Sequence, residues 1–70
     1  MVYYIMVTNE TTGAKEYIEY YDSFSGELIT TLAVSERQEY LSKESLLEEI
    51  NALINNEEFM KNYTFTVGGY

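Results

Sequence analysis

Paired carboxylates are the candidate catalytic groups of this 70-residue sequence. Glycoside hydrolysis needs two carboxyl groups that converge on one bond. Glu48-Glu49 and Glu57-Glu58 are adjacent in the sequence, and adjacent residues of a helix point in different directions. Glu44 and Glu48 do share a helix face, but no other polar group joins them. A solvated helix face therefore explains these carboxylates better than acid–base catalysis does.

Most other catalytic and cofactor-binding groups are missing. The sequence has no His and no Cys, which removes the usual general base, thiol nucleophile and zinc ligands. A single Arg provides no phosphate clamp, and Gly68-Gly69 has no helix after it, unlike a nucleotide-binding loop. Residues 22–27 partly match a calcium-binding loop, but Phe24 stands where an oxygen ligand is required. We therefore expect no enzyme activity, no cofactor and no metal, and we interpret 22–27 as a tight hairpin.

The charge balance is the most distinctive feature of the composition. Twelve Asp and Glu against four Lys and Arg give a net charge of −8, shared equally between residues 1–34 and 35–70. A field of this sign repels nucleic acid and anionic membranes and attracts basic protein surfaces. The alternative is acidity that serves only solubility, and on charge alone this alternative is favoured.

Length and composition indicate a single domain over residues 1–70 in a reducing, cytoplasmic environment. Seventy residues build one modest core, and the absence of Cys excludes disulfides. The apolar run Met1–Val7 lacks the basic flank of a signal peptide and is too short to span a membrane.

Hydrophobic periodicity predicts how these residues are positioned. Apolar and alternating runs indicate strands at 2–7, 15–21, 27–34 and 63–67. Ser35–Gln38 fits a capping box that starts a short helical turn, and Ser42 is the expected N-cap of an amphipathic helix that ends at Asn55-Asn56. The order is βββαβ: a three-stranded antiparallel meander, one helix packed on one sheet face, and a final strand that returns beside the first. This is an α+β fold.

Strand alternation divides the sheet into two faces. The helix-facing side is expected to contain Tyr3, Ile5, Val7, Ile18, Tyr20, Leu28, Leu32, Val34, Phe65 and Val67. The opposite face then carries Tyr4, Met6, Tyr17, Glu19, Tyr21, Ile29, Thr31, Thr64 and Thr66. Tyrosine and methionine are enriched at protein interfaces, so we interpret the second face as a binding surface. Cross-strand tyrosine pairs that merely stiffen an exposed sheet are the weaker alternative.

The predicted partner-binding residues combine this face with the carboxylates of the neighbouring hairpin. They are Tyr4, Met6, Glu16, Tyr17, Glu19, Tyr21, Asp22, Glu27 and Ile29. Such a surface fits a protein with a basic groove, and carboxylates spaced like phosphates would exclude nucleic acid from that groove. The alternative use is a symmetric homodimer, an adaptor whose acidity serves solubility. Neither use involves direct contact with nucleic acid or a membrane.

A resemblance to known proteins favours the basic partner protein over the homodimer. The segment Tyr40–Ile50, between a strand ending in Leu32-Ala33-Val34 and the strand Tyr63–Val67, is similar to the layout of many small phage-encoded proteins. In size and charge the chain resembles phage inhibitors such as anti-CRISPR proteins and uracil-DNA glycosylase inhibitors. The resemblance is architectural and carries no diagnostic motif, so no binding residues carry over. It implies an inhibitor of a host defence or nucleic-acid-processing protein, with a nucleic-acid-binding effector as its partner in the host cytoplasm.

Overall fold

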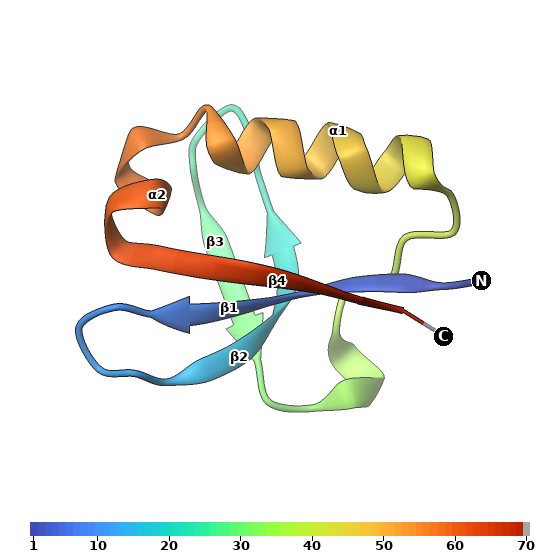
Figure 1. Cartoon of the computed structure of the whole chain (residues 1–70), viewed down its shortest axis with the longest axis horizontal. Helices are drawn as coiled ribbons and strands as arrows, with labels where there is room; N and C mark the ends of the chain where they lie inside the picture. Colours follow the sequence, from blue (N-terminus) through green and yellow to red (C-terminus); the bar gives the residue numbers. More distant parts are fainter. Residues whose placement is uncertain (70) are drawn as a thin grey trace.

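A computed structural model describes residues 1–69 and arranges them as one antiparallel sheet with both α-helices on one face (Figure 1). The strands are β1 (Tyr3–Asn9), β2 (Lys15–Tyr21), β3 (Leu28–Thr31) and β4 (Tyr63–Gly69), in the sheet order β3-β2-β1-β4. The helices are a 3₁₀ turn, η1 (Val34–Glu36), and two α-helices, α1 (Lys43–Ile54) and α2 (Glu57–Asn62). The βββαβ order and the return of the last strand beside the first are confirmed.

Side-chain caps determine where both α-helices begin. The Ser42 hydroxyl accepts a hydrogen bond from the Ser45 N–H (3.2 Å), as its N-cap position predicts. Asn56, expected to help end α1, also begins α2, because its side-chain oxygen accepts from the Phe59 N–H (3.0 Å). The sequence did not predict α2, because six residues are too few to show a helical period.

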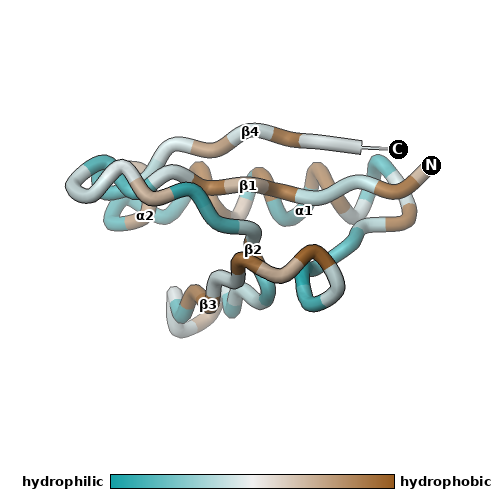
Figure 2. Tube along the Cα trace, turned by 90° about the horizontal axis from the view of Figure 1, so that it is seen from below, coloured by the Kyte–Doolittle hydropathy of each residue, from teal (hydrophilic) through white to brown (hydrophobic). Residues whose placement is uncertain are grey.

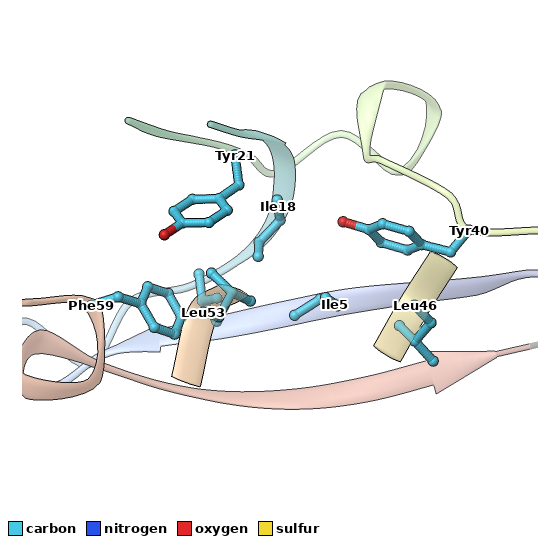
Figure 3. Close-up of a cluster of buried hydrophobic side chains, with 8 residues drawn as sticks. Ile5, Ile18, Tyr21, Tyr40, Leu46, Leu53 and Phe59 are labelled. Atoms are coloured by element: carbon cyan, nitrogen blue, oxygen red, sulfur yellow. The ribbon is translucent and has the colours of Figure 1, made fainter. Parts of the chain in front are cut away.

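The core lies between the sheet and the two helices (Figure 3). It consists of Ile5, Val7, Ile18, Tyr21, Tyr40, Leu46, Leu53 and Phe59. Four predicted core residues are instead exposed: Tyr20, Leu32, Val34 and Val67. For Leu32 and Val34 the reason is that β3 ends at Thr31, whose hydroxyl accepts from the Ala33 N–H (3.1 Å) and turns the chain out of the sheet.

A β-bulge in β2 reverses the predicted faces of Tyr20 and Tyr21. Ile18 lies opposite Thr30, but Tyr20 lies opposite Ile29, so Glu19 is an extra residue in its strand. Alternation therefore shifts by one position after Glu19. Tyr21 points toward the helices and is buried, and Tyr20 points outward. The prediction that Tyr21 belongs to the outer face was wrong, as was the prediction that Tyr20 belongs to the core.

Strands β1 and β2 separate beyond the pair Met6–Tyr17, and the segment that follows η1 fills the gap. Gln38 N–H donates to the Ile18 carbonyl (2.8 Å). Tyr3 and Tyr40 exchange two backbone hydrogen bonds, of 2.9 and 2.8 Å. As a result, β2 and β3 run steeply across the direction of β1 and β4 in Figure 1, and they lie away from those strands in Figure 2.

Tyr40 makes the stability of this core depend on pH in the alkaline range. Its hydroxyl donates to Glu49 Oε2 (2.9 Å), and burial together with that carboxylate raises the pKa of the phenol far above its ordinary value of 10.0. Because the folded state keeps a proton that the unfolded chain loses, stability should fall as the pH rises through about 10. Tyr40→Phe should lower the free energy of unfolding at neutral pH by about 1 kcal/mol and remove this part of the pH dependence.

Urea unfolding followed by circular dichroism at neutral and alkaline pH measures both effects. Tyr20→Phe is the matched control, since Tyr20 is an exposed tyrosine of the same sheet. An equally steep alkaline loss of stability in Tyr40→Phe would show that another group is responsible.

Candidate functional site

The structure separates the nine predicted partner-binding residues by their position in the sheet. Tyr4, Met6, Tyr17 and Ile29 lie on the face away from α1. Glu19, Asp22 and Glu27 lie at the bulge and in the hairpin loop. Glu16 and Tyr21 point to the helix side: Glu16 accepts a hydrogen bond from the Thr30 hydroxyl (3.0 Å), and the Tyr21 hydroxyl accepts one from Asn56 Nδ2 (2.8 Å).

Arg37 covers the two outer-face tyrosines. Its guanidinium carbon lies 3.7 Å from the centroid of the Tyr4 ring and 5.1 Å from that of Tyr17. The two rings meet edge to face, with centroids 5.5 Å apart. The Arg37 side chain is only 6% exposed, and its Nη2 lies 3.3 Å from Glu39 Oε2. Tyr4 and Tyr17 therefore form a packed platform for a cation, which is a structural role, instead of the open patch that the sequence predicted.

Gly68 completes this platform from the β4 side. It pairs with Tyr4, and a Cβ at this position would collide with Cζ and Oη of the Tyr4 ring. Gly68 and Gly69, which lie beyond the predicted strand 63–67, are therefore part of β4, and Tyr70 lies outside the described residues. The glycine lets the aromatic ring lie directly against the backbone of the neighbouring strand.

Five of the eleven exposed large apolar side chains among the described residues lie on the β2–β3 hairpin and the turn after it. They are Phe24 (101% exposed), Leu32 (77%), Val34 (54%), Tyr20 (46%) and Ile29 (43%). The same segment contains five carboxylates and neither Lys nor Arg: Glu16, Glu19, Asp22, Glu27 and Glu36. We refer to residues 16–36 as the acidic hairpin. It combines apolar contact area with a uniform negative charge.

The loop that carries Phe24 is held by Asp22. The Asp22 carboxylate accepts from the Phe24 N–H (2.9 Å) and from the Ser25 hydroxyl (3.0 Å), and the Glu27 N–H donates to the same hydroxyl (3.2 Å). The bonds that the carboxylate accepts, first that from the Phe24 N–H and then that from the Ser25 hydroxyl, lower the pKa of Asp22 below its ordinary value of 3.8. Gly26 closes the turn with a φ of +78°, a value that favours glycine. Phe24 is therefore presented on an ordered turn, which lowers the entropy lost on binding.

A groove of about 680 Å³ lies beside this loop. Its walls come from the hairpin loop, the junction of α1 and α2, and the start of β4. Side-chain amides of Asn9, Asn55, Asn56 and Asn62 alternate there with the aromatic rings of Tyr21, Phe24, Phe59 and Tyr63. Glu58 is the one charged residue among the described residues that line it. Such a mixture of apolar area and hydrogen-bonding groups suits contact with another protein.

Within residues 1–69, no three Asp or Glu side chains cluster closely enough to hold a metal ion. Neither α1 nor α2 has the length and apolarity of a membrane-crossing helix.

No family model matches this chain, and neither a curated protein nor a solved structure matches it. The resemblance to phage inhibitors therefore stays a prediction.

The sequence predicted a surface around Tyr4 and Tyr17, whereas the fully exposed aromatic side chain of the structure is Phe24. Phe24 was considered only as a residue that spoils a calcium loop, although an apolar side chain flanked by serines in a turn is itself a signal of an exposed contact. Arg37 gave no signal, because nothing in its neighbourhood indicates a stack with Tyr4, which is distant in sequence.

Proposed function

We propose that this protein is a non-enzymatic inhibitor that binds another protein through its acidic hairpin. The observation that carries the proposal is Phe24: a fully exposed aromatic side chain on a turn ordered by Asp22, in a segment with five carboxylates and no basic residue. Aromatic anchors of this kind contribute most of the binding energy at protein interfaces. Tyr20 and Ile29, which pair across β2 and β3, are further exposed apolar side chains of the same hairpin.

The charge of the hairpin selects the class of partner. A segment with five carboxylates and no Lys or Arg of its own attracts a surface rich in Lys and Arg, and it accelerates encounter with that surface. Such surfaces in nucleic-acid-processing proteins bind phosphates, so the hairpin would compete with nucleic acid for the same groove. A phage-encoded inhibitor of a host defence protein, acting in the host cytoplasm, fits this combination of small size, acidity and an exposed anchor.

Two charge variants with the same net charge test the proposal. Glu19→Gln/Glu27→Gln removes two carboxylates from the acidic hairpin, and Glu44→Gln/Glu48→Gln removes two exposed carboxylates from α1. Partners are captured from a lysate on the immobilised wild-type protein and identified. Affinity of each purified partner is then measured for the three proteins at low and high salt. We expect the hairpin variant to bind at least about tenfold more weakly at low salt and the α1 variant to bind almost normally.

Competition decides whether binding is also inhibition. The wild-type protein should displace a labelled nucleic acid from the purified partner, and the hairpin variant should displace it less effectively. Equal losses in both variants would show that net charge alone drives the interaction. Binding that survives high salt and the hairpin substitutions would exclude an electrostatic contact through this surface.

A further inference from the structure

β4 is the longer open edge of the sheet. One of its edges pairs with β1 along all seven residues, Tyr63 to Gly69, and the other has no neighbouring strand among residues 1–69. Proteins usually protect such an edge with charged residues, proline or a very short strand. β3, at the opposite end of the sheet, has only four residues. β4 contains neither a proline nor a charged side chain.

The hydrogen bonds of β1 show which groups of β4 point outward. Tyr3 and Asn9 bond on the side away from β4, to Tyr40 and to the turn before β2. In an antiparallel ladder this bonding side alternates, so Tyr4, Met6 and Thr8 bond to β4. Their partners there are Gly68, Thr66 and Thr64. The N–H and C=O groups of Phe65 and Val67 therefore point outward, and no residue within 1–69 bonds to them.

An apolar strip runs along the helix side of this edge. Glu49 bonds to Tyr40, which pairs with β1 on the side opposite β4. Around the axis of α1, the side chains of Leu47 and Ile54 point about 160° and 140° away from that of Glu49. Because Glu49 faces Tyr40, on the side opposite β4, Leu47 and Ile54 face the β4 side. Both are about half exposed, as is Val67 on the helix-facing side of β4. An additional strand beside β4 would cover all three side chains.

We propose that β4 pairs antiparallel with β4 of a second copy of this chain, so that the two sheets become continuous. In the register that uses both outward residues, Phe65 lies opposite Val67 of the second copy, and each exchanges two hydrogen bonds with its partner. Thr66 then lies opposite Thr66 of the second copy as a non-hydrogen-bonded pair on the outer face. The two-fold axis places both α1 helices on the same side of the sheet, where the two apolar strips cover each other.

Charge favours a second copy over a basic peptide at this edge. Neither β4 nor the strip formed with Leu47 and Ile54 contains a carboxylate that could pair with Lys or Arg of a peptide. The uncharged β4 of a second copy needs no such opposite charge. The net charge of −8 on each copy opposes association, so added salt should strengthen the dimer. This is the reverse of the salt effect expected for the acidic hairpin, which lies at the other end of the sheet and stays free in the dimer.

Cysteine cross-linking tests the register directly, because the chain has no native Cys. In a non-hydrogen-bonded pair the two Cα atoms are about 4.5 Å apart, close enough for a disulfide. Thr66→Cys should therefore form a covalent dimer under mild oxidation. Thr64→Cys is the matched control: it is equally an exposed outer-face threonine of β4, but its copy lies four residues away along the strand, about 13 Å. Equal cross-linking of both variants, or of neither, would overturn the proposal.

Sedimentation equilibrium tests the unmodified protein. We expect a monomer–dimer equilibrium that shifts toward the dimer with added salt. Val67→Lys should weaken the dimer roughly 100-fold, because both copies lose an apolar contact. Circular dichroism must show that Val67→Lys remains folded; if it unfolds, Leu47→Lys on the exposed strip replaces it. A protein that stays monomeric at all concentrations and salts would overturn the proposal, and so would a dimer indifferent to both substitutions. Neither result bears on the hairpin, whose test uses other residues and the opposite salt dependence.

Discussion

Phe24→Ala is expected to weaken binding to the partner by roughly 10- to 100-fold and to leave the free energy of unfolding unchanged. Burial of a phenylalanine side chain contributes about 1.5–3 kcal/mol to the free energy of binding. The Phe24 ring is fully exposed in the free protein, so all of its surface can be buried by a partner. The ring also contributes no packing to the core, so its removal should not change the free energy of unfolding. Isothermal titration calorimetry with the purified partner and urea unfolding measure the two quantities.

The control for Phe24→Ala is Leu41→Ala. Leu41 is 79% exposed and lies directly before α1, outside the acidic hairpin, so its loss should affect neither binding nor stability. An unchanged affinity in Phe24→Ala would remove the main support for the hairpin as the binding surface. A loss of stability equal to the loss of binding would mean that the ring acts on the fold.

Arg37→Ala is expected to lower the free energy of unfolding by about 2–3 kcal/mol. Desolvated cation–π contacts are worth about 2 kcal/mol, and the aliphatic part of a buried Arg adds packing against both rings. A domain of this size is stabilised by roughly 4–10 kcal/mol in total, so the effect is a large fraction. The substitution also removes the salt bridge from Arg37 to Glu39. Urea unfolding followed by circular dichroism gives the value.

Two further variants separate charge from stacking. Arg37→Lys keeps the charge but lacks the planar group that stacks on Tyr4, so we expect it to recover only part of the loss. Lys61→Ala removes an exposed cation on α2 and should have almost no effect. If Arg37→Ala is as stable as the wild-type protein, the stack on Tyr4 and Tyr17 contributes no net stability.

Local patterns were sufficient to predict the strands, α1 and the order of the sheet. The alternate direction of side chains along a strand placed Ile5, Val7 and Ile18 on the helix-facing side, and all three are buried. Ser42 identified the start of α1 because capping depends only on residues within one helical turn. The charge of −8 likewise follows from composition and needs no fold.

The candidate surface depended on contacts that no local pattern encodes. The extra residue Glu19 exchanges the faces of Tyr20 and Tyr21, and a bulge leaves no periodic signal before the partner strand is known. Arg37 reaches Tyr4 only because Gln38 and Tyr40 pair with strands that lie far away in the sequence. With the tyrosine platform covered, the open carboxylates and apolar side chains that remain on this side are those of the acidic hairpin.

The sequence by itself determined which charged and reactive side chains exist: twelve carboxylates, one Arg, and neither His nor Cys. Only the tertiary structure decided which of those carboxylates share a segment with an exposed aromatic side chain. The physical reason is that composition and spacing set which side chains exist and which local elements they favour. Exposure, by contrast, is decided by what the rest of the chain packs against each face, as Arg37 does over Tyr4 and Tyr17.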